Sequence, residues 1–461
     1  MLGFKKKALN TVVGTVRASF NGFAVGGKKT KGVLTAGACK NCDCSDGYLR
    51  AGAGAREYIP SSLESVILAA NMPEPDRFFF LAKKESGGGY AEKLGYISTA
   101  GTVYVYDESA ASWANVYSFG KRMRPLTAID TDGNASNLFI GEKGLYTCSY
   151  EGDMASTGVT AASRAACFFK GRLYYVKEPF TLVYSAPYSA TEFTADIDDG
   201  GNVRFPSEDG KIVALLPFKE KLYLFYEYGI AELTPAGTAR EFVFRKVGYG
   251  GGRIFGDSVG ACEAGGEKAF FLAEDGVYAF DGTSTKKACK NLRITPVRGG
   301  QVCNHAVFEG KYFVVYPSTD GEKKGLIVDA ESGEGYFAFA PEGVSDHRGL
   351  AFCSFGLRVR VLSKDGALPS GEERVFSAGG IDFDTRGVKT LKRLLLTGGG
   401  SVRVAVSDGK NTQSFESAFE NGSMELKASL KGESFSIKLA LEKDAEVRSV
   451  TAEAQTLGGI K

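Results

Sequence analysis

Residues 169–176 read Phe-Lys-Gly-Arg-Leu-Tyr-Tyr-Val, and they hold the pattern that decides the fold. A polar two-residue turn is followed by a basic residue and then by a run of aromatic and aliphatic residues. The same plan returns at residues 218–225, 266–272 and 308–315. The basic residues of the four copies lie 49, 47 and 43 positions apart, at Arg172, Lys221, Lys268 and Lys311. A period of about 40 to 50 residues with several short strands is typical of β-propeller blades.

A second strand-like run follows each of the first three copies, at residues 180–184, 228–233 and 275–282. Gly or Asp-Gly between the two runs indicates a hairpin, because Gly adopts the positive φ that tight turns need. Weaker copies lie at residues 77–81 with 102–106, 137–140 with 144–146, and 357–362. We therefore predict an all-β protein with a propeller over residues 71–385. The count is about seven blades, with six and eight left open.

The two ends of the chain differ from this array. Residues 1–70 mix Gly, Lys and small residues, with an alternating pattern at 11–17, and we interpret them as an arm with strands. From residue 386 onward, apolar and polar residues alternate at 401–406, 423–428 and 434–439. Strict alternation marks half-buried antiparallel strands. It predicts an antiparallel, β-sandwich-like C-terminal domain over residues 386–461.

Composition excludes several classes of function. The 461 residues carry 56 Lys and Arg against 54 Asp and Glu, a net charge of +2, so no overall field attracts nucleic acid or an anionic membrane. There is no apolar run of membrane-spanning length, and the start is too polar for a signal peptide, so we expect no stable membrane insertion. Six of the nine cysteines are scattered singly, as buried thiols of a reducing compartment are.

Motifs that carry chemistry are missing from the sequence. The chain has two histidines, His305 and His347, and neither has a partner at a recognisable spacing, so we interpret both as structural or surface residues. The sequence contains no nucleophile elbow, zinc-binding helix motif or phosphate-binding loop. We predict that the protein is not an enzyme, with no catalytic, cofactor-binding or metal-binding residues and no cofactor.

Two segments keep an alternative open. Cys39, Cys42 and Cys44 would hold zinc if a fourth ligand came from elsewhere, although a turn with incidental thiols is the favoured interpretation. Residues 196–202 read Asp-Ile-Asp-Asp-Gly-Gly-Asn and offer oxygen ligands. They lack the order of a calcium-binding loop and its closing Glu, which favours a solvated loop between blades.

Part of the chain resembles a known family. Residues 183–187 (Val-Tyr-Ser-Ala-Pro), 209–215 (Asp-Gly-Lys-Ile-Val-Ala-Leu) and 256–259 (Gly-Asp-Ser-Val) carry the likeness, together with Glu192-Phe193, residues 222–225 and the run 271–282. They resemble the tail nozzle, or tail tubular, proteins of short-tailed bacteriophages and related proteins that stabilise packaged DNA. Residues 44–50 resemble the region where such proteins begin their first strand. The likeness is specific over roughly one hundred residues.

The resemblance implies a structural subunit of a phage tail: a nozzle, a tail-tube adaptor or a tail-tip ring that contributes to the DNA conduit. It implies self-association into a ring, contacts with other tail or head–tail connector proteins, and transient passage of DNA. The protein would be made in the host cytoplasm and reside in the virion. The alternative is a propeller module that binds a host surface glycan or protein, and a propeller hydrolase or lyase ranks third. The third would bring pairs of acidic residues to the axis.

Overall fold

The computed structural model describes residues 14–25, 31–58, 74–193, 200–234, 242–262, 267–290, 292–297, 303–355 and 358–456. The chain divides into two compact units. The propeller unit comprises Gly54–Glu334 and Phe339–Ser370, and the terminal unit comprises Met1–Ala53, Gly335–Ala338 and Gly371–Lys461. Each unit is described separately below.

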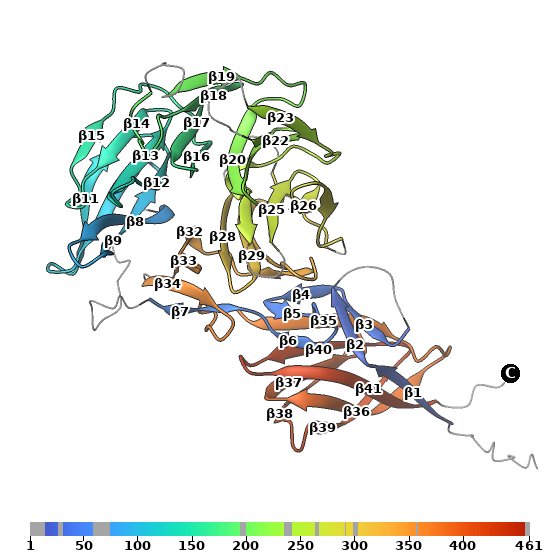
Figure 1. The fold of residues 1–461 in the computed structure, drawn as a ribbon. Coiled ribbons are helices and arrows are strands. Elements are labelled where there is room, and N and C mark those ends of the chain that lie inside the picture. The colour runs from blue at the N-terminus through green and yellow to red at the C-terminus, as the bar shows by residue number, and fades with distance from the viewer. Residues whose placement is uncertain are drawn as a thin grey trace, which may run out of the picture. The chain divides into compact units, whose positions relative to one another are not determined.

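The first five blades of the propeller unit are four-stranded antiparallel sheets formed by consecutive strands (Figure 1). Blade one has β8 (Pro75–Glu85), β9 (Gly89–Ser98), β10 (Thr102–Asp107) and β11 (Ser112–Ser118). Blade two has β12 (Met123–Ile129), β13 (Ala135–Gly141), β14 (Gly144–Cys148) and β15 (Met154–Ser156). Blade three has β16 (Ala166–Phe169), β17 (Arg172–Glu178), β18 (Thr181–Tyr184) and β19 (Gly201–Arg204). Blade four has β20 (Ile212–Phe218), β21 (Lys221–Tyr226), β22 (Ile230–Thr234) and β23 (Val243–Val247). Blade five has β24 (Gly260–Cys262), β25 (Lys268–Ala273), β26 (Gly276–Phe280) and β27 (Thr285–Lys287), preceded by the 3-10 helix η2 (Gly256–Ser258).

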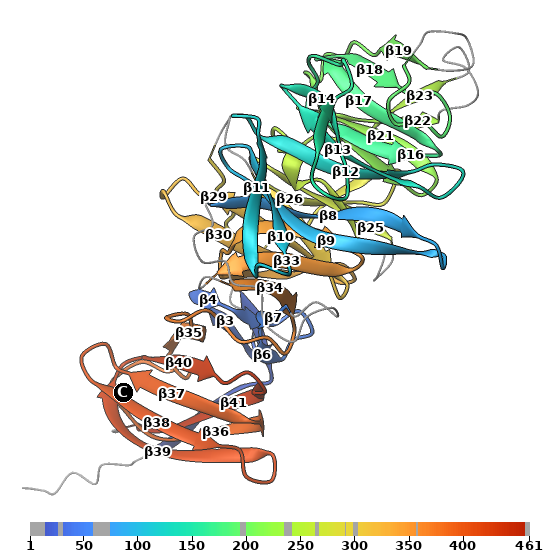
Figure 2. The same ribbon diagram turned by 90° about the vertical axis from the view of Figure 1, so that its left-hand side faces the viewer.

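Two further blades complete the ring. Within the propeller unit, blade six comprises β28 (Asn304–Phe308), β29 (Lys311–Pro317) and β30 (Lys323–Asp329). Blade seven comprises β32 (Glu342–His347), β33 (Leu350–Phe355) and β34 (Arg358–Ser363). Its fourth strand is β7 (Gly54–Glu57), which comes from the start of the unit and lies beside β34 (Figure 2). The first strands of the seven blades contact one another in succession, from β8 round to β32 and back to β8. The described residues thus form a closed, seven-bladed propeller, as predicted.

The repeated sequence pattern forms the first hairpin of a blade. Phe169 pairs with Arg172, Phe218 with Lys221 and Phe308 with Lys311, each across a two-residue turn. Both turn residues have positive φ, at Lys170-Gly171 (46° and 76°), Lys219-Glu220 (48° and 61°) and Glu309-Gly310 (44° and 73°). Two positive φ values define the type I′ turn, whose twist matches that of the flanking strands. The polar turn and basic residue of the pattern therefore specify the register of each hairpin.

Aromatic side chains fill the space between adjacent blades. Phe225 of blade four lies with its ring centroid 5.5 Å from that of Phe271 and 6.0 Å from that of Phe280, both in blade five. All three rings are fully buried. Edge-to-face pairs of this kind add to the free energy gained from apolar burial. The aromatic runs thus stabilise the stacking of neighbouring blades. A single small sheet could not bury both of its faces alone.

The terminal unit contains two packed sheets. One has the order β39 (Ser423–Gly432), β36 (Lys389–Gly399), β41 (Glu446–Thr456), β6 (Leu49–Ala51) and β5 (Cys42–Asp43), with β1 (Gly14–Phe20) also paired to β41. The other has, within this unit, the order β31 (Gly335–Ala338), β4 (Ala38–Lys40), β35 (Arg374–Ile381), β40 (Phe435–Leu441), β37 (Ser401–Ser407) and β38 (Thr412–Ala418). A parallel pair, β2 (Gly22–Val25) and β3 (Val33–Ala36), joins the same core.

These units divide the chain differently from the sequence-based ranges 1–70, 71–385 and 386–461. The predicted N-terminal arm contributes strands to the terminal unit, where Gly14 pairs with Thr456 and β1 runs beside β41 (Figure 1). Residues 54–57 belong to the propeller unit, and residues 371–385 belong to the terminal unit. The reason is physical: strands from both chain ends bury one shared apolar core, including Phe23, Phe376 and Val450.

Candidate functional site

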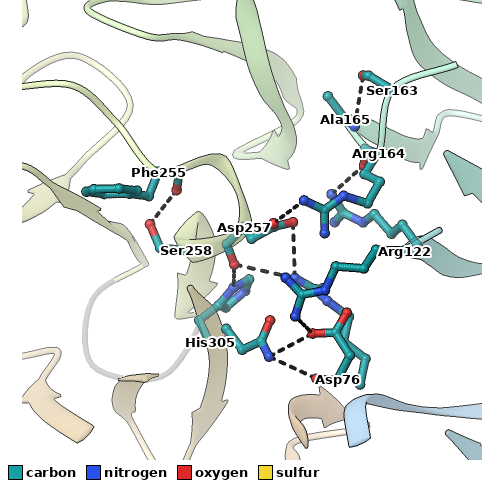
Figure 3. Close-up of polar contacts among 12 residues, drawn as sticks. Asp76, Arg122, Ser163, Arg164, Ala165, Phe255, Asp257, Ser258 and His305 are labelled. Atoms are coloured by element: carbon teal, nitrogen blue, oxygen red, sulfur yellow. Dashed lines mark hydrogen bonds and ion pairs between the residues drawn. The ribbon is translucent and has the colours of Figure 1, made fainter. Parts of the chain in front are cut away.

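Charged side chains converge where the first strands of the blades begin. Asp76 and Arg77 lie on β8, Arg124 on β12, and Asn304 and His305 on β28. Arg122 and Arg164 precede β12 and β16, and Asp257 lies in η2. We call these eight residues the axial cluster (Figure 3). It holds four guanidinium groups and two carboxylates, so with a neutral His305 it carries an excess of two positive charges.

Asp257 is the anionic centre of the cluster. Its carboxylate contacts Nη2 of Arg164 at 2.8 Å and Nη2 of Arg77 at 3.4 Å. Its backbone carbonyl accepts a hydrogen bond from Nδ1 of His305 at 2.7 Å, which places the proton of a neutral His305 on Nδ1. Burial acts to raise the pKa of Asp257, but the surrounding guanidinium groups, Arg164 first, hold it below the usual value. Asp257 therefore stays ionised.

Asp76 forms a second ion pair that is left incomplete. Its side chain is 1% exposed, and Oδ1 accepts hydrogen bonds from Arg122 and from Nδ2 of Asn304, the latter at 3.1 Å. Three buried atoms here have no hydrogen-bond partner among the described residues: Oδ2 of Asp76, Nε of Arg122 and Oδ1 of Asn304. Buried polar atoms are nearly always satisfied, so these atoms indicate that a water, an ion or a ligand binds here.

Arg124 has no carboxylate within ion-pair distance among the described residues. Its polar contact is a weak one, from Nη1 to the carbonyl oxygen of Arg164 at 3.5 Å. Burial, reinforced by repulsion from Arg77, lowers the pKa of Arg124 to about 10, although Asp257 acts in the opposite direction. Arg124 thus remains charged at neutral pH, and its charge is the least compensated in the cluster.

A cavity of about 520 Å³ adjoins the cluster. Its walls come from residues 161–165 before β16, 211–213 at the start of β20 and 253–257 up to η2, and they include Arg164, Asp257 and Cys303. The rim carries both signs of charge, from Glu142, Lys177, Glu178, Lys211 and Arg253. Its volume lies within the range of small-molecule sites. This cavity and the axial cluster form the candidate site.

The two histidines predicted to be structural or surface residues have different surroundings. His305 belongs to the cluster, and a Cβ on Gly260 would approach its Nε2 to 2.6 Å, so the ring is closely packed. His347 stacks on Phe80 with ring centroids 4.2 Å apart, and its Nε2 lies 3.0 Å from Glu92. The axial position of His305 had no sequence signal, because its contacts with Asp257 span 48 residues.

Lowering the pH is expected to destabilise the propeller unit through His305. Burial lowers the pKa of His305; Asp346 opposes this, and Arg77 and Arg124 reinforce it. The unfolded chain, with a His pKa near 6.5, therefore binds a proton before the folded chain does. Stability is complete above pH 7 and falls as the pH drops through about 6.5 toward the lower, folded-state pKa. Urea titrations from pH 7.5 to 5.5 measure this slope.

The pH series is repeated with His305→Gln and with His347→Gln. Both variants are needed because burial also lowers the pKa of His347, which therefore contributes to the same pH slope. We expect the pH slope to decrease in each single variant and to decrease most in the double variant. An unchanged slope in His305→Gln would contradict the assignment of this pH dependence to His305.

The three clustered cysteines lie in the core of the terminal unit. Cys39, Cys42 and Cys44 are all buried, and Sγ of Cys39 contacts the carbonyl oxygen of Cys42 at 3.6 Å. Hydrogen bonds from the thiols of Cys42 and Cys44 lower the pKa of Cys39, and the same bonds, with burial, raise the pKa of the other two. Across the described residues, no set of three or more His, Cys, Asp and Glu side chains is arranged to hold a metal ion. Residues 196–199 of the acidic segment 196–202 lie outside the described part.

A second surface of interest covers one sheet of the terminal unit. The outward side chains of β4, β35, β40, β37 and β38 form a cross-strand row of Ala38, Ser377, Lys438, Ala405 and Ser414. We call the outward side of these five strands the flat face. It holds two shallow hollows of about 360 and 440 Å³ that share Ala405 and Lys438. The outward side of β36, β39 and β41 carries an ion-pair network of Arg393, Glu425 and Glu453.

Comparisons with known proteins find no matching family model and no matching curated protein. Solved structures of similar architecture include virginiamycin B lyase from Staphylococcus aureus, with a TM-score of 0.40, 9% identity, and coverage of 65% of this chain and 97% of that one. BamB from Moraxella catarrhalis gives a TM-score of 0.36, 12% identity, and coverage of 67% and 97%. The β-propeller domain of Cps50 (Swd1) from Myceliophteria thermophila gives 0.38, 12%, and coverage of 62% and 98%. With TM-scores below 0.5, these likenesses do not bear on the function of this chain.

Within the described ranges, no helix has the length and apolar character needed to cross a bilayer.

Proposed function

We propose that this chain is a non-catalytic structural subunit of a bacteriophage tail, which assembles into a ring with copies of itself and contacts other tail or connector proteins in the virion. The observation that carries the proposal is the flat face of the terminal unit. The resemblance of residues 182–282 to tail nozzle proteins supplies the biological setting. The occupant of the flat face is a neighbouring copy of this chain.

The chemistry of the flat face supports this role. Its outward residues are mostly Ala, Ser, Thr and Gly, which allow another sheet to approach to the usual packing distance of about 10 Å. Five strands at about 4.8 Å spacing place the outer strand axes about 19 Å apart. The charges beside the row have both signs, with Glu373 contacting Arg403 at 3.2 Å and Lys438 at 4.0 Å. Mixed charge sets the register of a contact without strong repulsion between copies.

A ring requires a heterologous contact, in which the flat face meets a different surface of the next copy. The seven-bladed propeller already closes on itself through β7, so the DNA conduit of such an assembly would lie between subunits. The net charge of +2 suits a conduit through which DNA slides, because phosphate binding strengthens with each Lys or Arg contact.

Blocking the flat face tests the proposal. Ala405→Arg places a long cation beside Lys438 and is expected to leave the protein monomeric at concentrations where the wild type assembles. Sedimentation velocity, alone and with neighbouring virion proteins, measures this. The control is Ser429→Arg, which adds the same side chain at an exposed position of β39 on the other sheet. Equal assembly of both variants, or a wild-type protein that stays monomeric in both samples, would contradict the proposal.

A binding module for a host surface glycan or protein remains the second candidate. The observation that favours it is the cavity beside the axial cluster, because propeller ligands commonly occupy concave sites of this size. Saturable binding to a glycan array that the cavity variant Arg164→Met abolishes would support this candidate.

A further inference from the structure

Among the described residues, the axial cluster contains more positive charge than its carboxylates neutralise. Its four guanidinium groups face the carboxylates of Asp76 and Asp257, and each carboxylate is already engaged by at least one arginine. Asp346 lies near His305 but is exposed to solvent, and Glu142 at the cavity rim pairs with Lys121 at 3.5 Å. Neither faces Arg124 closely enough to form an ion pair. Cations that are partly withdrawn from water and have no partner are costly, so proteins tend to pair them with an anion.

The unsatisfied atoms indicate which ligand chemistry fits the cluster. Nε of Arg122 is a donor and needs an acceptor, whereas Oδ2 of Asp76 and Oδ1 of Asn304 are acceptors and need donors. A bare anion would satisfy the arginine and repel Asp76. An oxyanion that also carries an O–H group satisfies both kinds of atom.

We propose that the propeller axis binds a small oxyanion bearing an O–H group, held by Arg124, Arg164 and Arg122 and admitted through the adjoining cavity. Phosphate and the hydroxycarboxylates of acidic sugars share this chemistry. Arginine suits the role because its planar donors match two oxygens of one carboxylate or phosphate. The adjoining cavity, whose wall includes Arg164 but not Arg122 or Arg124, has a volume of about 520 Å³ and is large enough to admit either ligand. This inference rests on the propeller unit alone and is independent of the proposed assembly.

Thermal unfolding of the full chain, dialysed free of oxyanions, tests the inference. Sodium phosphate and sodium glucuronate are titrated separately against sodium chloride and sodium sulfate at matched ionic strength and pH 7. A ligand that binds only the folded state raises the Tm in proportion to the logarithm of its concentration. We expect this for phosphate, glucuronate or both, and the active arm identifies the class of ligand. Sulfate carries no O–H group at this pH and is expected to act more weakly.

The informative variant is Arg124→Met, because no carboxylate loses a partner when it is replaced. We expect its apparent affinity to fall by about tenfold or more, as for loss of a charge-assisted hydrogen bond. The control Arg448→Met removes an exposed arginine of the terminal unit and is expected to respond as the wild type does.

Three results would overturn the inference. The first is a Tm that follows only ionic strength in every titration. The second is an equal response of the two arginine variants, and the third is a sulfate response as large as the phosphate response. If Arg124→Met fails to fold, equilibrium dialysis of the wild type with radiolabelled phosphate and glucuronate decides. About one bound ligand per chain supports the inference, and no binding above the chloride background refutes it.

Discussion

Replacing Asp257 by alanine is expected to lower the free energy of unfolding of the propeller unit by about 3 kcal/mol, because it leaves two partly buried guanidinium groups without their shared anion. Asp257 contacts Arg77 and Arg164, and its side chain is 17% exposed, so solvent replaces the carboxylate only in part. The first strands of blades one, three and five would lose the charge that joins them. Urea denaturation followed by tyrosine fluorescence measures the change.

Two further variants control this experiment. Glu151→Ala removes an exposed carboxylate of the same unit, 3.3 Å from Lys83, and its effect is expected to be too small to resolve. The double variant Asp257→Ala with Arg124→Met is expected to recover part of the lost stability, because it also removes an uncompensated cation. A loss below about 1 kcal/mol for Asp257→Ala would show that solvent satisfies the arginines.

Detaching β7 from the seventh blade is expected to lower the free energy of unfolding of the propeller unit by a similar amount. Ala55 of β7 is fully buried, pairs with Leu362, and donates its N–H to the carbonyl oxygen of Ala367 at 2.9 Å. Ala55→Pro removes that donor from a fully buried residue, and the lost hydrogen bond costs about 1 kcal/mol before any loss of ring closure. We expect a lower urea midpoint together with faster proteolysis of the propeller unit, as β7 detaches.

Ala418→Pro is the matched control, at the end of edge strand β38. The next residue, Phe419, donates its N–H to Gly400, so alternation along the strand directs the N–H of Ala418 away from β37. Proline is tolerated at such a position. If both variants unfold alike, or if Ala55→Pro is as stable as the wild type, then closure through β7 does not hold the propeller together.

The hairpins were predictable because their signals are local. The Lys170-Gly171 and Glu309-Gly310 turns precede strands whose apolar runs are continuous, and each turn fixes its register within four residues. Alternation likewise predicted β37, β39 and β40 of the terminal unit correctly. The blade count followed from these repeats.

The strand pairs that close the propeller and the terminal unit were not predictable, because each joins segments that are far apart in the sequence. Arg56 of β7 pairs with Val361, and Gly14 of β1 pairs with Thr456. The sequence of neither strand has a pattern that identifies its partner strand. The axial cluster was not predictable for the same reason. Arg77 and Asp257 are 180 residues apart in the sequence and meet only when the propeller closes. An alignment of the blades would have revealed one signal of the axial cluster. This signal is a polar residue at or just before the first strand of successive blades.

Cryo-electron microscopy of the concentrated wild-type protein, alone and with its virion neighbours, shows whether the subunits assemble through the flat face. We predict closed rings of identical subunits in which the flat face, from Ala38 across to Ser414, is covered by the next copy. Particles that remain single in both samples, or rings whose flat face stays open to solvent, would contradict it.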